Sequence, residues 1–246
     1  LKNKQTNNWS TTKGTANAIY ALLLSGNDWL NADKEPIITL GKKVIETSTL
    51  QKEAGSGYFK FDIKDKEITK DLANVKIENR NPVPSWGAIY WQYFEQLDKI
   101  KTFKETPLTL AKQYFIEENS NSGPKLIEIN ENRVLKPGDK LKVRIVLKVD
   151  REMEFVHLKD MRPANTEPIN VISQYKWQDG LGYYESTKDL SSNFFMDYLP
   201  KGTFVFEYPL NIVREGNCST GIATIQCMYA PEFSSHSNGL KLKVGK

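Results

Sequence analysis

The run of residues 141–149 most constrains the fold of this chain, because apolar and charged side chains alternate along it. Leucine, valine or isoleucine occupies every odd position, and basic side chains stand at 142, 144 and 148. Successive side chains of a β-strand point to opposite faces of the sheet. The run therefore predicts an antiparallel strand with one face buried and the other in solvent.

Other short extended runs surround this strand, and turns that contain glycine or proline separate them. Seven or more such strands at short intervals are typical of an antiparallel β-sandwich. Residues 199–202, Leu-Pro-Lys-Gly, are expected to form a turn between two of them. The expected strands of the sandwich are residues 141–149, 155–159, 171–177, 183–186, 193–197, 203–210, 222–229 and 240–244. In the charged, weakly patterned region before them, only residues 108–116 and 126–129 show a pattern.

Residues 9–26 have the spacing of apolar side chains that predicts a helix. Thr11 or Thr12 can cap its start, and Gly26 can end it. A single amphipathic helix cannot bury its own apolar face, so we expect partners in a domain upstream or in the β-structure that follows. The side chains that need such partners are Trp9, Ile19, Leu23, Trp29 and Leu30.

The segment from residue 36 to the region of Lys101 predicts a first β-domain. Residues 86–94 are aromatic on both alternating faces, so we expect a strand that is buried on both sides. We place the domain boundary near Lys101, where the chain becomes charged and weakly patterned. The other strands expected in this domain are residues 37–40, 43–47, 58–61 and 75–79.

Charge and composition exclude some classes of partner. The 246 residues include 34 basic and 30 acidic side chains, intermixed, with a formal net charge of +4, which indicates an ordinary surface and no nucleic-acid site. The two cysteines and two histidines do not form the four-ligand set of a structural zinc site, and we expect no metal or cofactor. The first thirty residues contain neither a signal peptide nor a membrane span, and the chain begins at Leu1, so we expect a fragment of a longer protein.

The sequence contains little that indicates catalysis. No Gly-x-Ser-x-Gly, phosphate-binding glycine loop or His-Glu-x-x-His motif occurs. His157 lies in an alternating run and is expected to face solvent or an interface, and His236 lies in a polar loop whose serines do not form a triad with it. An enzyme would need a polar pocket with perturbed carboxylates around His157. Asp160 and Arg162 are expected to stabilise a turn, either as a pair or with Arg162 bound to carbonyl groups.

The C-terminal stretch predicts a strand over residues 222–229 that Pro231 ends, because proline has no N–H to donate. Cys227 and Tyr229 would face one way and Met228 the other. Cys218 and Cys227 are close enough in sequence for a disulfide, whose loop of about ten residues would contribute about 2–3 kcal/mol. If the register of the two strands does not place the cysteines opposite one another, they remain two thiols. The sequence leaves both outcomes open.

Five motifs resemble, in the same order, the C-terminal region of bacterial alpha-2-macroglobulin family proteins, the Bacteroides-type members in particular. They are Trp-Ser-Thr-Thr-Lys-Gly-Thr-Ala at 9–16, Trp-Gly-Ala-Ile-Tyr-Trp-Gln-Tyr-Phe-Glu at 86–95, Lys-Asp-Met-Arg-Pro-Ala at 159–164, Tyr-Tyr-Glu-Ser at 183–186 with Asp189, and Met-Tyr-Ala-Pro-Glu at 228–232. The resemblance covers nearly the whole chain. It implies that residues 1–32 are the last helix of an α/α-toroid thioester domain, residues 33–100 the second half of a CUB-like β-domain, and residues 101–246 a C-terminal macroglobulin-like, immunoglobulin-like β-sandwich.

Proteins of this family are protease traps, so the resemblance implies a non-catalytic part of a protease inhibitor. The thioester motif of the family is Cys-x-Glu-Gln, and neither Cys218 nor Cys227 matches it. In bacterial members a Met-Tyr pair of the terminal domain shields the thioester from water, and Met228 and Tyr229 match that pair. A thioester survives in water only when it is desolvated, which an aromatic ring and a thioether can achieve.

The resemblance also implies the partners of the chain, namely the upstream domains of the parent and, through the parent, target proteases. We expect a monomeric fragment, without nucleic acid, in the periplasm or the cell envelope, including the outer membrane, of a Gram-negative bacterium. The alternative is an envelope adhesion module, or a carbohydrate- or protein-binding β-sandwich, whose exposed platform consists of Trp177, Tyr183 and Tyr184. That alternative depends on the exposure of Tyr183 and Tyr184.

Overall fold

The structure is a computed structural model that describes residues 9, 11–25, 34–55 and 57–245. The chain divides into two compact units, of which one is Ser10–Gln92 and the other includes Tyr93–Lys246. Each unit has its own sheets. Within the described ranges, no helix combines the length and the apolar character that a bilayer crossing requires.

The unit Ser10–Gln92 contains the predicted helix, α1 (Thr12–Leu24). The Thr11 side chain caps it by accepting a hydrogen bond of 3.0 Å from the Gly14 backbone N–H. No residue of α1 is buried. Gly26, Trp29 and Leu30 lie outside the described residues.

A three-stranded antiparallel sheet follows, in the order β2 (Lys43–Ile45), β1 (Ile37–Leu40), β3 (Val75–Glu78). Short 3-10 helices connect the strands, namely η2 (Thr47–Thr49), η3 (Asp65–Glu67) and η4 (Lys70–Ala73). The prediction of a strand at residues 58–61 is wrong, because only one isolated bridge, between Lys52 and Phe59, forms there. Gly55 and Gly57, both at positive φ, lie in the turn between the two bridged residues.

The aromatic segment 86–94 is not a strand, which contradicts the prediction of a strand buried on both faces. Trp86, Tyr90 and Tyr93 are mostly exposed, and the Phe94 side chain is fully exposed. Burial on both faces requires neighbouring strands and two covering layers. The described residues supply no strand that pairs with this segment.

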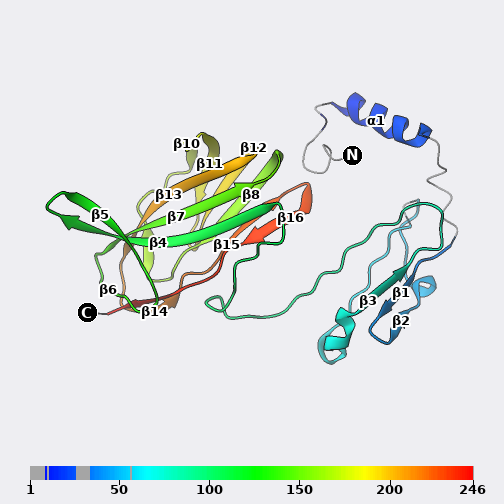
Figure 1. The fold of residues 1–246 in the computed structure, drawn as a ribbon, viewed down its shortest axis with the longest axis horizontal. Coiled ribbons are helices and arrows are strands. Elements are labelled where there is room, and N and C mark those ends of the chain that lie inside the picture. The colour runs from blue at the N-terminus through cyan, green and yellow to red at the C-terminus, as the bar shows by residue number, and fades with distance from the viewer. Residues whose placement is uncertain (1–8, 10, 26–33, 56, 246) are drawn as a thin grey trace. The chain divides into compact units, whose positions relative to one another are not determined.

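The unit that includes Tyr93–Lys246 is a β-sandwich of two antiparallel sheets (Figure 1). The five-stranded sheet has the order β5 (Gly123–Glu128), β4 (Leu108–Ser120), β7 (Lys140–Val149), β13 (Gly202–Ile212), β9 (Thr166–Pro168). The six-stranded sheet has the order β10 (Gln174–Gln178), β11 (Leu181–Thr187), β12 (Ser191–Leu199), β8 (Met153–Met161), β15 (Ala223–Cys227), β16 (Ala230–His236). A smaller sheet has the order β14 (Gly216–Ser219), β17 (Lys241–Val244), β6 (Val134–Leu135).

The core lies between the two large sheets, as the alternating pattern predicts. In β7, Val143, Ile145 and Leu147 are fully buried, and Arg144 and Val146 between them are partly exposed. Phe194 in β12 contacts Phe206 in β13, with ring centroids 5.7 Å apart, so aromatic side chains of both sheets meet in the centre. The prediction of an antiparallel β-sandwich is confirmed.

The C-terminal hairpin differs from its prediction. Strand β15 ends at Cys227, and Pro231 lies inside β16 instead of ending the ladder. Strand β16 is the outermost strand of its sheet, where a missing backbone N–H is tolerated. The register jumps from Gln226 opposite Ser234 to Cys227 opposite Ala230, so Pro231 falls in a bulge.

Candidate functional site

Met228 and Tyr229 form the two-residue turn between β15 and β16. Cys227 and Ala230 pair on either side of this turn. The Met228 side chain is 56% exposed and that of Tyr229 is 78% exposed. The expectation that Tyr229 shares the buried face of Cys227 is therefore wrong, because the turn interrupts the alternation of the strand. Both side chains project from the tip of the hairpin into solvent.

Phe155 of β8 supports the turn. The Met228 backbone N–H donates to the Phe155 carbonyl oxygen at 2.9 Å, and the Tyr229 ring meets the Phe155 ring edge-on, with centroids 5.2 Å apart. Phe155 has a φ of 55°, which is rare for a residue with a bulky side chain. Such strain is maintained only where surrounding contacts fix it, and it concentrates at functional sites. The turn is thus anchored while most of the Tyr229 ring stays exposed.

The turn presents a thioether and a phenol ring to solvent. The nearest thiol, Cys227, is buried, and its Sγ donates to the Glu154 carbonyl oxygen at 3.4 Å. Burial raises the pKa of Cys227, which keeps the group a thiol. The arrangement can therefore cover another surface.

Both cysteines are free thiols in the structure, which is one of the two outcomes that the sequence left open. Cys218 lies in β14 of the small sheet, whereas Cys227 lies in β15 of the six-stranded sheet. The Cys218 thiol donates to the Asn165 side-chain oxygen at 2.8 Å, and burial raises its pKa. Each thiol thus has its own acceptor, and the two thiols lie in different sheets.

The histidines occupy separate places in the sandwich. His157 stacks on Phe195, with ring centroids 4.6 Å apart, and its Nε2 lies 3.0 Å from the Asn193 side-chain oxygen. His236 stacks on Phe103 at a centroid distance of 5.7 Å. Their contacts include aromatic rings, the Asn193 amide and, for His236, the Ser237 carbonyl oxygen at 3.3 Å. Within the part of the chain that the structure describes, no cluster of three or more His, Cys, Asp or Glu side chains could hold a metal.

The exposed platform of the alternative prediction forms only in part. Tyr183 is 4% exposed and packs against Phe194 and Phe206, so its assignment to a surface platform is wrong. Tyr184 is partly exposed, and Trp177 is 79% exposed. Adjacent strand residues point to opposite faces, which explains why Tyr183 enters the core and Tyr184 does not.

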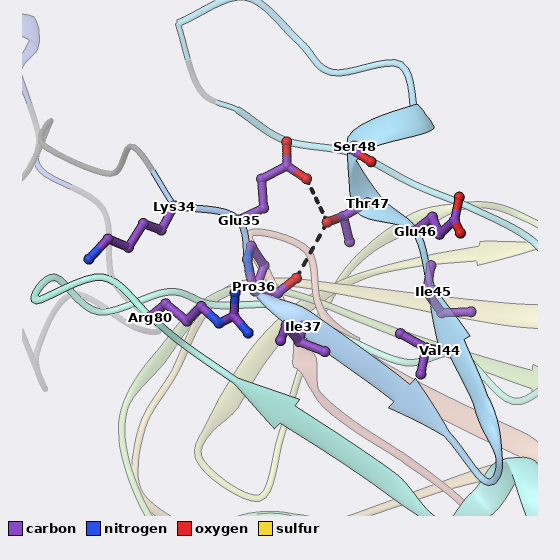
Figure 2. Close-up of a pocket in the computed structure, with 10 residues that line it drawn as sticks. All are labelled: Lys34, Glu35, Pro36, Ile37, Val44, Ile45, Glu46, Thr47, Ser48 and Arg80. Atoms are coloured by element: carbon purple, nitrogen blue, oxygen red, sulfur yellow. Dashed lines mark hydrogen bonds between the residues drawn. The ribbon is translucent and has the colours of Figure 1, made fainter.

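The unit Ser10–Gln92 contains an open pocket of about 520 Å³ beside β1 and β2 (Figure 2). Its Glu35 carboxylate accepts a hydrogen bond of 2.7 Å from the Thr47 hydroxyl and pairs with Lys52. The hydrogen bond from Lys52 lowers the pKa of Glu35, and Thr47 contributes in the same direction. Both carboxylate oxygens are thus engaged in fixing the loop, and we assign the pocket a structural role.

A buried ionic cluster in the sandwich was not predicted. Lys112 of β4 and Asp160 of β8 form an ion pair with an Nζ–Oδ1 distance of 2.5 Å, and their side chains are 1% and 0% exposed. The Tyr208 hydroxyl donates to the other oxygen of Asp160 at 2.5 Å. Arg162 instead donates to the carbonyl oxygens of Lys188 and Asp189, which confirms the second of the two alternatives for this residue.

The sequence does carry a signal for this ion pair. Lys112 follows Leu108 and Leu110 at an inward position of its strand, and Asp160 likewise follows Val156 and Leu158. A charge at an inward position needs an opposite charge to be tolerated. Two opposite charges at inward positions of different strands therefore indicate a buried pair.

Ionisation of the buried tyrosines is expected to weaken the sandwich above pH 10. Burial raises the pKa of Tyr183 to about 12 and that of Tyr114 and Tyr208 well above the usual value. In the unfolded chain these phenols ionise near pH 10. From about pH 10 to 12 the folded state therefore binds more protons than the unfolded state, and the free energy of unfolding falls as the pH rises. The decrease is up to about 1.4 kcal/mol per pH unit for each proton. In a titration followed by tyrosinate absorbance, part of the tyrosines should ionise only at a pH well above 10. Their ionisation should coincide with loss of the β-sheet signal in circular dichroism. Ionisation of all eleven tyrosines near pH 10 with the sheets intact would contradict this.

Comparison with known proteins identifies the sandwich. The family model described as Bacterial Alpha-2-macroglobulin MG10 domain matches residues 108–232, about half of the chain. The chain belongs to the bacterial alpha-2-macroglobulin family. The prediction of this family from the five sequence motifs is confirmed. Comparison with curated proteins gives no match.

Several solved alpha-2-macroglobulin structures are similar to the chain. Salmonella alpha-2-macroglobulin reacted with methylamine has 14% identity and a TM-score of 0.46, with 71% of this chain and 11% of the Salmonella chain covered. Trypsin-activated alpha-2-macroglobulin from Escherichia coli has 12% identity and a TM-score of 0.45, with 72% of this chain and 13% of the Escherichia coli chain covered. The native Escherichia coli alpha-2-macroglobulin from domain MG7 to the C-terminus has 11% identity and a TM-score of 0.45, with 72% of this chain and 29% of that chain covered. The chain thus spans a minor part of each of these alpha-2-macroglobulins.

The MG10 match locates the alpha-2-macroglobulin signal within the fold. It begins at the first residue of β4 and ends inside β16, so it includes the Met228–Tyr229 turn and the Lys112–Asp160 pair. The unit Ser10–Gln92 lies outside the match.

Proposed function

We propose that the chain is the non-catalytic C-terminal part of an alpha-2-macroglobulin-like protease inhibitor. The MG10 match over residues 108–232 carries this proposal. The parent would trap target proteases, and this part would serve the trap through contacts with the upstream domains. The chain by itself would be monomeric and would bind no nucleic acid.

The N-terminal elements fit a chain whose packing partners lie in other domains of the parent. In our proposal, residues 1–32 end a thioester-type α/α domain, residues 33–100 form the second half of a CUB-like β-domain, and residues 101–246 form the terminal sandwich. The exposed apolar side chains of α1 and the exposed aromatic segment 86–94 support this, because large apolar surfaces on a monomer usually mark contacts. The parent would reside in the periplasm or the cell envelope, including the outer membrane, of a Gram-negative bacterium.

The Met228–Tyr229 turn would shield the thioester of the parent from water. Its two exposed side chains, a thioether and an aromatic ring, can desolvate a reactive carbonyl without reacting with it. The contacts of the turn with Phe155 support this role, since they anchor the turn and leave Tyr229 free to contact another domain.

Tyr229→Ala tests the shield in the full-length parent. We expect the thioester to react with a labelled primary amine about tenfold faster, because the lost ring contact contributes about 1–1.5 kcal/mol to closure. The measurement is the rate of label incorporation before any protease is added.

Tyr175→Ala is the matched control, because Tyr175 is 76% exposed in β10 of the same sheet and belongs to the other edge. It should leave the rate unchanged. An equal rate for Tyr229→Ala and the unmodified parent would refute the shield while leaving the inhibitor proposal intact. A parent without Cys-x-Glu-Gln would also refute it and would leave a purely steric trap.

A second candidate, an adhesion or carbohydrate- or protein-binding module, has support from one row of side chains. Tyr175, Tyr184, Phe195 and His157 stand opposite one another across four neighbouring strands of the six-stranded sheet. Tyr175 and Tyr184 are in edge-on contact, and His157 stacks on Phe195. Such a row could form a binding surface, but it does not account for the MG10 match, so we rank this candidate second.

A further inference from the structure

The Lys112–Asp160 pair bridges the two layers of the sandwich. Lys112 belongs to β4 of the five-stranded sheet, and Asp160 belongs to β8 of the six-stranded sheet. Neither side chain reaches solvent. A covalent bond between them would therefore join the two sheets through the core.

The contact has the geometry of two reacting groups. Lys112 Nζ donates to the carbonyl oxygens of Met161 at 2.8 Å and Thr220 at 3.4 Å, which occupies two of its protons. Asp160 Oδ1 lies 2.5 Å from Nζ, but the two atoms do not meet the angles of a hydrogen bond, and Oδ1 has no hydrogen-bond partner among the described residues. A C–O bond is about 1.2 Å long, so Nζ lies within about 3.7 Å of the carboxyl carbon, close to the range for nucleophilic attack.

The surroundings favour a neutral amine and a polarised carboxyl group. Burial lowers the pKa of Lys112, although Asp160 opposes the shift. Burial keeps the Tyr208 phenol protonated by raising its pKa, so the phenol remains a hydrogen-bond donor to Asp160 Oδ2. A donor at that oxygen stabilises the negative charge that develops there when a nucleophile adds to the carbon.

We propose that Lys112 Nζ and the carboxyl carbon of Asp160 condense to an amide bond that cross-links the two sheets. One proton first passes from the ammonium to Oδ1, which gives an amine and a carboxylic acid. The amine lone pair then forms the C–N bond, a second amine proton passes to Oδ1, and the C–Oδ1 bond breaks with release of water. Oδ2 becomes the amide oxygen with Tyr208 as its donor, and the third proton stays on nitrogen, where it can donate to the Met161 carbonyl. The reaction needs no oxidant, reductant or cofactor.

The fold also provides a place for the released water. A pocket of about 100 Å³ is lined by Lys112, Tyr114 and Thr220 among other residues. Its backbone and hydroxyl groups supply the polar partners that a water molecule requires.

Intact mass spectrometry of the folded and then denatured chain tests the cross-link. We expect the main species to be lighter than the sequence mass by one water molecule, with both cysteines alkylated after denaturation. Proteolytic digestion should give one branched peptide that joins residues 112 and 160. Tyr208→Phe should decrease the fraction of the lighter species.

Lys112→Arg is the control, because arginine preserves the charge and cannot form this amide under the same conditions. Its mass should equal that calculated from its sequence. If the measured mass of the wild-type chain equalled the mass calculated from its sequence, the proposal would be overturned, and Lys112 and Asp160 would form a simple ion pair. A loss of water that persists in Lys112→Arg, or that maps to other residues, would overturn it as well.

Discussion

Replacing Phe194 with alanine is expected to lower the free energy of unfolding of the sandwich by about 3–5 kcal/mol. Phe194 is 1% exposed, and its ring centroid lies 5.6 Å from that of Tyr183 and 5.9 Å from that of Tyr208. Removal of the ring would leave a cavity where the two sheets meet, and the neighbouring rings are held by their own contacts. Urea unfolding followed by circular dichroism measures the change.

Phe195→Ala is the matched control, because this neighbouring residue is 44% exposed and points to the other face of the same strand. It stacks on His157, so we expect a loss of about 1 kcal/mol or less. Equal losses for the two variants would show that the core does not lie where the structure has it.

Asp160→Ala is expected to lower the free energy of unfolding by about 3–5 kcal/mol as well, for an electrostatic reason. The change leaves the Lys112 ammonium in the core without a carboxylate and removes the acceptor of the Tyr208 hydroxyl. A loss is expected whether the pair is an ion pair or an amide, because either form satisfies Lys112. Urea unfolding measures it.

Asp150→Ala provides the comparison, since Asp150 pairs with Arg151 at the surface. Exposed pairs contribute about 0–1 kcal/mol, so this variant should remain close to the unmodified chain. If Asp160→Ala were equally mild, Lys112 would have to reach water or lose its proton in the folded state, and the presence of a buried ammonium in this variant would be contradicted.

The strands were predictable where one face of a sheet is buried and the other is not. Residues 141–149 show this best, because each inward position is apolar and each became part of the core. Strand β1 begins and ends where its apolar run does. Strands β6, β9, β14 and β16 were missed. The first three show no apolar alternation in the sequence, and β16 contains Pro231, which was expected to end a strand.

The errors arise where burial depends on something beyond the local pattern. The aromatic residues of segment 86–94 indicate that burial is favourable, but they do not specify which surface provides it. The turn at Met228 and Tyr229 contains neither glycine nor asparagine, so nothing local interrupts the strand pattern. The candidate site was thus located from the resemblance, and its exposure emerged only from the three-dimensional structure.

Pro231 has a consequence for the behaviour of the protein in a crowded compartment. It lies in β16, the outermost strand of the six-stranded sheet. Phe103 and Thr106 bond to the carbonyl oxygens of His236 and Ser234 in the second half of this strand, so a foreign strand could add itself only along the first half, around Pro231. The bulge distorts the row of hydrogen-bonding groups that such a strand would need, and proline lacks one of the donors. The same residue that was expected to end a strand therefore protects this border against fibril-like association between molecules.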